Sequence, residues 1–257
     1  MTKIHPTAVV DSNAQLGEDV KVGPYSIIEG DVIIGDGTEI AYHAVIASGT
    51  RIGRKCRVFS NAVIGTEPQD LKFGNEKTFV EIGDNTTIRE FATVNRATTH
   101  SYTTKVGSNC LIMAYAHVAH DCHIGDYVVL ANAVNMAGHV TIENHVGVGG
   151  MVAIHQFVHI GTQSFIGGLS RVSKDVPPYI LAMGEPLTFA GLNSVGLKRR
   201  GFKSETLQEL KRAYKMLYRE KLTTEEAIAK IENTLTLTPE IEHLIGFLRG
   251  SERGIIR

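Results

Sequence analysis

The sequence predicts a parallel β-helix followed by a shorter α-helical segment. An aliphatic residue recurs at every sixth position through the first two thirds of the chain, and its phase never slips. A small or β-branched residue stands four positions after each aliphatic. After about residue 200 the apolar spacing changes to that of α-helices. A six-residue period of this length is typical of a β-helix in which three repeats close one triangular coil.

The aliphatic series starts at Ile4 and ends at Val172, and only Asp70, Glu76 and His100 interrupt it. We expect the aliphatic side chains to fill the prism, with the small residues beside them. Glycine often follows the aliphatic, as at Gly35 and Gly125, which predicts a turn with positive φ at that position. An alternating β-sandwich would not hold one phase for so long, because its turn spacing varies.

The three cysteines fit this register. Cys56, Cys110 and Cys122 each stand four residues after an aliphatic, at the small inward position. We expect buried thiols that act as small apolar groups. A disulfide or a cysteine metal site is disfavoured, because no two cysteines have C-x-x-C spacing.

Composition excludes several classes of function. The 257 residues carry a formal net charge of −1, whereas a protein that binds nucleic acid or an anionic membrane usually has a basic excess. The repeat begins within the first residues, which leaves no room for a signal peptide, and no apolar run is long enough to span a bilayer. We therefore expect a cytoplasmic protein.

Two domains are expected. Residues 1–178 form the prism, from which the polar segment 66–79 is ejected as a loop without a change of phase. Residues 97–104 form a second, shorter excursion. The prism is expected to end at Asp175–Pro178, because two adjacent prolines cannot continue a ladder of hydrogen bonds. Residues 179–257 form a connector and a helical domain, which could cap the open end of the prism.

Three helices are predicted in the second domain. Ser204 is the expected N-cap of a helix that runs through Leu217. Thr223 and Glu226 have the spacing of a capping box. Thr238 with Pro239 at the first helical position predicts the start of the last helix.

A polar cluster is predicted where successive coils stack. Six of the eleven histidines lie between positions 117 and 155. Since one coil has 18 residues, His120 should stack below Gly138 and Gln156, Asp121 below His139, and Ala119 below His155. Layers about 4.8 Å apart would bring these pairs within roughly 10 Å.

This cluster has the groups that acyl transfer requires. His120 can act as a general base near neutral pH, and Asp121 can orient its ring. The backbone N–H of Gly138 can stabilise an oxyanion one layer away. A single histidine on a turn is most often idle and solvated, but three stacked polar pairs favour an active site. The accepting group could be a hydroxyl or an amine.

A zinc site is the alternative from another class. Carbonic anhydrases built from such repeats bind zinc through three histidines, of which two stand five residues apart. No two histidines between 117 and 159 have that spacing, so no metal ligand is assigned. A scaffold without catalytic activity is a further alternative, and it would tolerate loss of His120.

The motifs AHVAHDC (116–122), AGHV (137–140), HQF (155–157), DVPPY (175–179) and GLKRRGF (196–202) allow an identification. Together with the loop sequence QDLK (69–72), they resemble the UDP-N-acetylglucosamine O-acyltransferases of lipid A biosynthesis over nearly the whole chain. The resemblance implies a left-handed coil and a homotrimer with active sites between prisms. It also implies transfer of an (R)-3-hydroxyacyl group from acyl carrier protein to the glucosamine 3-hydroxyl of UDP-N-acetylglucosamine. No cofactor is implied beyond the phosphopantetheine of the donor.

The resemblance also implies roles for individual residues. His120 is implied as the catalytic base, Asp121 as its partner and Gly138 as the oxyanion donor. Gly168 is implied to limit the length of the acyl chain. The implied substrate contacts are Asp70, Lys72, His117, His139, His155, Gln156, Asn193, Arg199 and Arg200.

One position departs from the family pattern, and some questions stay open. Val195 stands where family members carry an acidic residue, which puts one nucleoside contact in doubt. Lys198, Arg199 and Arg200 could also meet the acidic carrier protein, although a solvated basic face is more common. The related N-acyltransferases usually carry an additional N-terminal domain, whereas here the repeat starts at Ile4. Acyl length and acceptance of a 3-amino sugar are not determined by the sequence.

Overall fold

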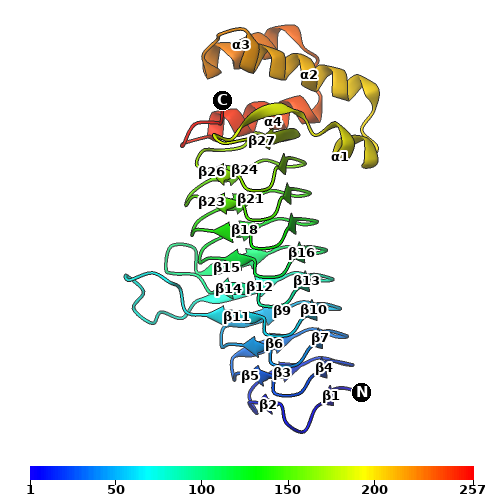
Figure 1. Ribbon diagram of the computed structural model, residues 1–257, viewed down its shortest axis with the longest axis vertical. Helices are drawn as coiled ribbons and strands as arrows, with labels where there is room; N and C mark the ends of the chain where they lie inside the picture. Colours follow the sequence, from blue (N-terminus) through cyan, green and yellow to red (C-terminus); the bar gives the residue numbers. More distant parts are fainter.

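The 257 residues form a three-sided prism of stacked β-coils that is covered at one end by helices, as the computed structural model shows (Figure 1). Each coil gives one short strand to each of three sheets, named here sheets A, B and C. The predicted parallel β-helix with a helical C-terminal segment is therefore confirmed. None of the helices is long and apolar enough to cross a membrane.

The strands follow one another around the prism in the order A, B, C. Sheet A contains β1 (Lys3–Ile4), β4 (Lys21–Val22), β7 (Glu39–Ile40), β10 (Arg57–Val58), β13 (Thr87–Ile88), β16 (Leu111–Ile112), β19 (Val129–Leu130), β22 (Gly147–Val148), β25 (Phe165–Ile166), β27 (Ile180–Met183) and β28 (Thr188–Leu192). Sheet B contains β2 (Val9–Val10), β5 (Ile27–Ile28), β8 (Val45–Ile46), β11 (Val63–Thr66), β14 (Thr93–Asn95), β17 (His117–Val118), β20 (Asn135–Met136), β23 (Ala153–Ile154) and β26 (Arg171–Val172). Sheet C contains β3 (Gln15–Leu16), β6 (Val32–Ile34), β9 (Thr50–Ile52), β12 (Phe79–Ile82), β15 (Thr103–Val106), β18 (His123–Ile124), β21 (Thr141–Ile142) and β24 (His159–Ile160).

The register explains why the aliphatic phase survives both excursions. Most strand partners are 18 positions apart, as in the pair His123 and Thr141. Across the first loop Arg57 pairs with Thr87, 30 positions later, and across the second Thr93 pairs with His117, 24 positions later. The excursions therefore add 12 and 6 residues, which are whole repeats. The longer loop, residues 67–78 between β11 and β12, projects from the side of the prism (Figure 1).

The predicted core fills the prism. Its aliphatic residues are fully buried from the second coil onward, while Ile4 at the uncovered N-terminal end is 47% exposed. The three cysteines are buried and unpaired, as expected. Burial raises the pKa of Cys110 to about 11 and that of Cys122 to about 12, so both thiols stay protonated and unreactive at neutral pH.

Glycine is required after the aliphatic residue for a different reason from the one predicted. A Cβ added to Gly35 would lie 2.7 Å from the carbonyl carbon of Gly53 and 2.8 Å from the nitrogen of Arg54. Positive φ instead occurs two positions further on, as at Lys55 after Gly53 (φ 53°). At Gly35 the neighbouring coil thus lies too close for a side chain, and backbone conformation is not the cause.

The ladder does not end at the two prolines, which corrects the expectation for residues 175–178. Pro177 and Pro178 lie in a turn, where the ladder needs no N–H donor from them. Parallel pairing resumes with β27 against β25, where Leu181 is opposite Phe165. The chain then reverses into β28, which pairs antiparallel with β27 and forms the edge of sheet A. The first residues of the connector therefore extend the sheet.

Four helices follow: α1 (Ser194–Arg199), α2 (Ser204–Arg219), α3 (Thr224–Thr234) and α4 (Pro239–Gly250). Helix α4 lies against the last coil, and α2 and α3 lie beyond it (Figure 1). The capping box of Thr223 and the cap of Thr238 are confirmed. The N-cap of α2 is Lys203, so Ser204 is its first helical residue. The short helix α1 was not predicted, because six residues carry too little periodicity to detect.

Candidate active site

The predicted stack of polar residues lies at the corner where sheet B turns into sheet C, named here the B–C corner. His120 and Asp121 are in the turn from β17 to β18, and Gly138 and His139 are in the turn from β20 to β21. The backbone N–H of His139 donates to the carbonyl of His120 at 3.1 Å, which joins the two layers. The 18-residue spacing thus places these groups in adjacent coils, as predicted.

His120 and Asp121 form a close pair. Nδ1 of His120 lies 2.7 Å from Oδ2 of Asp121, and the carboxylate side chain is fully buried while the imidazole is 13% exposed. Asp121 adopts positive φ (60°), a conformation that Asp tolerates better than most residues, and this turn directs its side chain back toward the preceding layer. The pair leaves Nε2 of His120 as the atom free to accept a proton.

Asp121 is held by a second group of residues that sequence reasoning missed. Its two oxygens accept hydrogen bonds from the backbone N–H and hydroxyl groups of Thr98 and Ser101, which lie on the 97–104 excursion. Burial alone would raise the pKa of Asp121, but hydrogen bonds from His120, Ser101 and Thr98 hold it well below its usual range. Asp121 is therefore ionised at neutral pH.

Gly138 lies directly against the ring of His120. A Cβ at this position would be 2.6 Å from Cε1 and 2.7 Å from Nε2 of the imidazole. Only glycine leaves the ring in its place. The N–H of Gly138 has no acceptor within the chain, so it can donate to a bound molecule beside His120.

His117 and His139 complete the wall of the corner. His139 stacks on Phe157 with ring centroids 4.4 Å apart and meets His120 edge-on at 5.0 Å. Burial lowers the pKa of His139 and that of His117, so both rings are neutral at pH 7. Nδ1 of His139 is buried without a partner. His117 contacts the hydroxyl of Thr93 at 2.7 Å.

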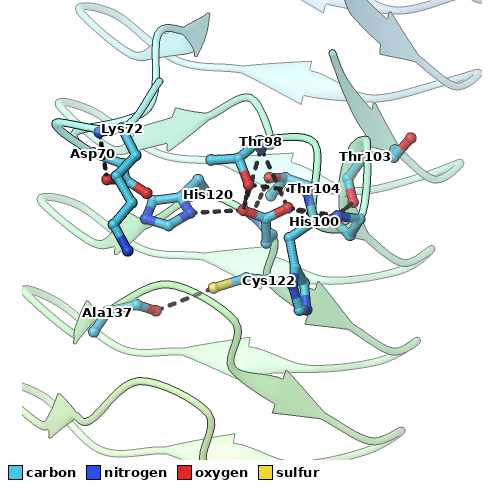
Figure 2. Close-up of polar contacts among 11 residues, drawn as sticks. Asp70, Lys72, Thr98, His100, Thr103, Thr104, His120, Cys122 and Ala137 are labelled. Carbon is cyan, nitrogen blue, oxygen red and sulfur yellow. Dashed lines mark hydrogen bonds and ion pairs between the residues drawn. The ribbon is translucent and has the colours of Figure 1, made fainter. Parts of the chain in front are cut away.

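Asp70 and Lys72 reach the same corner from the ejected loop. Figure 2 shows them on the side of His120 opposite Thr98. The base of this loop is fixed by the amide of Asn95, which donates to Thr66 and to the carbonyl of Glu67 at 2.8 Å. Leu71 between the two charged residues is fully exposed.

His155 and Gln156 occupy the next turn of the B–C corner, from β23 to β24. Both are exposed, and the ring nitrogen of His155 lies 3.1 Å from the carbonyl of Gln156. They continue the predicted column but make no direct contact with the His120 pair.

The remaining predicted residues lie elsewhere on the prism. Asn193, Arg199 and Arg200 line a cavity of about 570 Å³ on the outer face of sheet A, beneath α1. Asn193 donates to the carbonyl of Gln163 at 2.8 Å, and Arg200 donates to that of His145 at 3.1 Å. Gly168 lies in the turn from β25 to β26, between sheets A and B. Sheet A is the side of the triangle opposite the B–C corner, so one chain does not bring these residues to His120.

Two details of this cavity bear on what it can bind. The Nη1 atom of Arg200 is buried without a partner, which leaves part of a guanidinium available to an anion. Val195, where the family pattern has an acidic residue, is 81% exposed at the rim. The cavity also has an apolar wall that includes Val129, Phe165 and Leu181.

Donor atoms of His120, Asp121 and His139, which the 18-residue spacing predicts to be neighbours, lie within 4.8 Å of one another. A metal ion bound there would have to replace the hydrogen bonds that Asp121 already accepts from His120, Thr98 and Ser101. The donor set therefore fits a hydrogen-bonded His–Asp pair better than a metal centre.

Comparisons with known proteins agree with this architecture. Residues 175–256 match the family model described as Udp N-acetylglucosamine O-acyltransferase, domain 2, and residues 13–48 and 103–138 match the bacterial transferase hexapeptide model. The acyl-[acyl-carrier-protein]--UDP-N-acetylglucosamine O-acyltransferase of a Sulfurihydrogenibium species is 57% identical over 99% of this chain and 94% of its own length. The enzyme of that name from Myxococcus xanthus is 48% identical over the full length of both chains.

The solved structure of LpxA from Acinetobacter baumannii superposes with a TM-score of 0.96, at 44% identity and 99% coverage of both chains. The repeats and this neighbour fit a left-handed coil. The chain therefore belongs to the family of acyl-[acyl-carrier-protein]--UDP-N-acetylglucosamine O-acyltransferases.

Proposed function

We propose that this chain transfers an (R)-3-hydroxyacyl group from acyl carrier protein to the 3-hydroxyl of UDP-N-acetylglucosamine, the first step of lipid A biosynthesis, with His120 as general base. The observation that carries the mechanism is the buried His120–Asp121 pair beside the unpartnered N–H of Gly138. Family membership supports the acyl donor and the sugar nucleotide acceptor.

In the first half of the reaction, Nε2 of His120 accepts the proton of the sugar hydroxyl while the oxygen attacks the thioester carbonyl. Asp121, ionised and fixed by its donors, stabilises the imidazolium that forms. The N–H of Gly138 donates to the carbonyl oxygen, which becomes an oxyanion in the tetrahedral intermediate.

In the second half, the carbon–sulfur bond breaks and the phosphopantetheine sulfur leaves. His120 returns its proton to that sulfur, which regenerates the neutral imidazole. The products are the 3-O-acyl sugar nucleotide and free carrier protein. Since the thioester is already an activated acyl group, this mechanism requires neither a metal nor a covalent enzyme intermediate.

We propose further that the active unit is a homotrimer in which the sheet A cavity of one prism faces the B–C corner of its neighbour. The two sets of predicted residues lie on opposite sides of one prism, so one site can contain both only if two chains contribute. Arg200, with its unpartnered Nη1, would then bind a phosphate of the nucleotide. Val129 and Phe165 on sheet A are over one third exposed, as expected of a face that a neighbour covers.

Mixing two inactive variants tests both parts of the proposal. His120→Ala should abolish most activity as a pure protein, because loss of a general base typically costs about 10²–10⁴ in rate. Arg200→Ala should also abolish most activity, because the guanidinium that binds the nucleotide phosphate is lost. In trimers reassembled at random from equal amounts of both, roughly a quarter of the interfaces would pair an intact His120 with an intact Arg200. The mixture should therefore recover up to about a quarter of the wild-type activity.

Three results would contradict the proposal. His120→Ala with activity within a few-fold of wild type would remove the general base. An active monomer in light scattering at assay concentration would remove the trimer. Mixed chains that exchange subunits but gain no activity would show that His120 and Arg200 do not act across an interface.

A further inference from the structure

The excursion at residues 97–104 covers the buried side of the His120–Asp121 pair. It supplies the one additional repeat between β14 and β15, and it turns back over the B–C corner before rejoining the prism at Thr103. Two of its residues, Thr98 and Ser101, point their hydroxyl groups at the carboxylate of Asp121. Neither residue reaches the ring of His120.

The carboxylate of Asp121 is fully saturated by these contacts. Oδ1 accepts the hydroxyl of Ser101 at 2.6 Å and its N–H at 3.0 Å. Oδ2 accepts the hydroxyl of Thr98 at 2.8 Å and lies 2.7 Å from Nδ1 of His120. A carboxylate has about four lone-pair sites, so this set fixes the plane of the group as well as its position.

Such a cage is more than a turn requires. The backbone N–H groups of Thr98 and Ser101 alone would satisfy a carboxylate at a loop. The two hydroxyl bonds are shorter, and the Thr98 hydroxyl shares its acceptor oxygen with His120. The Thr98 hydroxyl therefore acts on the oxygen that holds the imidazole, and the Ser101 hydroxyl fixes the other oxygen of the same carboxylate.

We propose that Thr98 and Ser101 are positioning residues for acyl transfer, which orient the Asp121 carboxylate and thereby hold the His120 ring at the angle that proton transfer requires. This inference rests on the proposed role of His120 as general base. The hydroxyl donors also draw charge from Asp121, which limits how strongly that carboxylate holds the proton on His120.

A direction for the pH dependence follows. Removing the hydroxyls leaves more negative charge on the Asp121 carboxylate, which strengthens its attraction for the protonated form of the His120 ring. Since a general base must be neutral to accept a proton, the acid limb of the rate profile should move to higher pH. The other titratable groups around the pair are His100, His117, His139, Asp70 and Lys72, and these stay in place in the variants.

The experiment compares Thr98→Val, Ser101→Ala and the double variant with two reference variants. Thr99→Val makes the same chemical change one residue away, at an exposed side chain without hydrogen bonds, so it controls for damage to the excursion. Thr98→Ser restores the hydroxyl and should rescue the effect. Trimer state and Tm are measured for every variant.

The double variant should lose about 10- to 100-fold in kcat, the cost of a small misplacement of a catalytic group. Its KM for the sugar nucleotide should stay within about twofold of wild type, since the cage does not touch the acceptor. Its acid limb should move to higher pH, while Thr99→Val and Thr98→Ser should keep the wild-type profile. A double variant with wild-type kcat and an unmoved acid limb would overturn the inference, as would equal losses in Thr99→Val.

Two further measurements keep the outcome clear. The acid limb of the rate profile of Ser101→Ala should lie at higher pH than that of wild type, and an unmoved limb would overturn the inference even if the double variant does not fold. His120→Ala separates the two levels of the proposal. If it stays active, the general base assignment fails; if it is inactive while the double variant behaves as wild type, only the role of Thr98 and Ser101 fails.

Discussion

Replacement of Gly138 by alanine would test the geometry of the site without removing a polar group. The new Cβ would lie 2.6 Å from Cε1 and 2.7 Å from Nε2 of His120, whereas ordinary contacts begin at 3.4 Å. The ring must therefore move by about 0.8 Å, because backbone hydrogen bonds of Ala137 and His139 fix the chain on both sides of Gly138. A shift of that size would stretch the 2.7 Å contact with Asp121 or rotate Nε2 away from the acceptor.

We expect Gly138→Ala to lose roughly 100-fold in kcat, since a displacement of about 1 Å can cost that much. The N–H of residue 138 is retained, so the loss would measure the position of His120 and not the oxyanion contact. The matched control is Gly30→Ala, which has the same place in its repeat and the same corner of the prism. Its added Cβ would meet only the side chain of Asp11, at 3.2 Å.

Steady-state kinetics with the carrier-protein donor, together with Tm for both variants, provide the measurement. Gly30→Ala should retain wild-type kcat. If Gly138→Ala also retains it while His120→Ala is inactive, the contact between residue 138 and the imidazole has no role in placing the base.

Two other predictions concern acyl length and the joint between prism and helices. Gly168→Met should shift preference to shorter acyl donors, because the new side chain would occupy space that the end of a longer acyl chain needs, at about 0.8 kcal/mol per excluded methylene. Identical chain-length profiles for donors of about ten to sixteen carbons would place the limit elsewhere. Glu143 contacts His159 and His243 at 2.8 and 2.7 Å. Burial opposes ionisation of Glu143, but its close contacts with the two histidines lower its pKa to about 2, and Glu143 in turn raises the pKa of His243. Its stabilising effect should therefore be greatest between about pH 4.5 and 6.5, falling below that range as Glu143 is protonated and above it as His243 loses its proton, so the Tm difference between wild type and Glu143→Gln should peak near pH 5.5 and a constant difference from pH 3 to 8 would contradict this.

The stacking of the coils was predictable from the sequence, because it depends on the six-residue repeat. A constant six-residue spacing determines which residues stack, so the sequence alone places Gly138 and His139 one layer from His120 and Asp121. The reason for glycine after the aliphatic was misjudged, because a period gives the position of a turn but not the distance between neighbouring coils. The continuation past Pro177 and Pro178 was missed for a related reason. A proline lacks the N–H that a strand residue donates to the ladder, but a residue in a turn does not need that donor, so pairing resumes after the two prolines.

The site residues that the six-residue repeat could not predict lie in a segment that interrupts it. Thr98 and Ser101 lie where the aliphatic series is broken by His100, so no spacing rule connects them to Asp121. A run of hydroxyl residues in a segment that breaks the repeat was the only signal. The resemblance implied active sites between prisms, but only the structure assigns Arg200 to the sheet A cavity and His120 to the opposite corner.

At the B–C corner the stacked coils and the 97–104 excursion contribute different physical properties. The ladder gives rigid positions, which is what the His120 ring and the N–H of Gly138 need, but its turns have room for few side-chain donors. A buried carboxylate needs several donors, because an ionised group without them would be strongly destabilised. Inserting one whole repeat solves this without moving any residue above it: the excursion brings the hydroxyls of Thr98 and Ser101 to Asp121, and β15 resumes in register with β12 and β18. The register of the prism and the ionisation of Asp121 thus depend on the same six inserted residues, so a deletion of one or two of them should damage both.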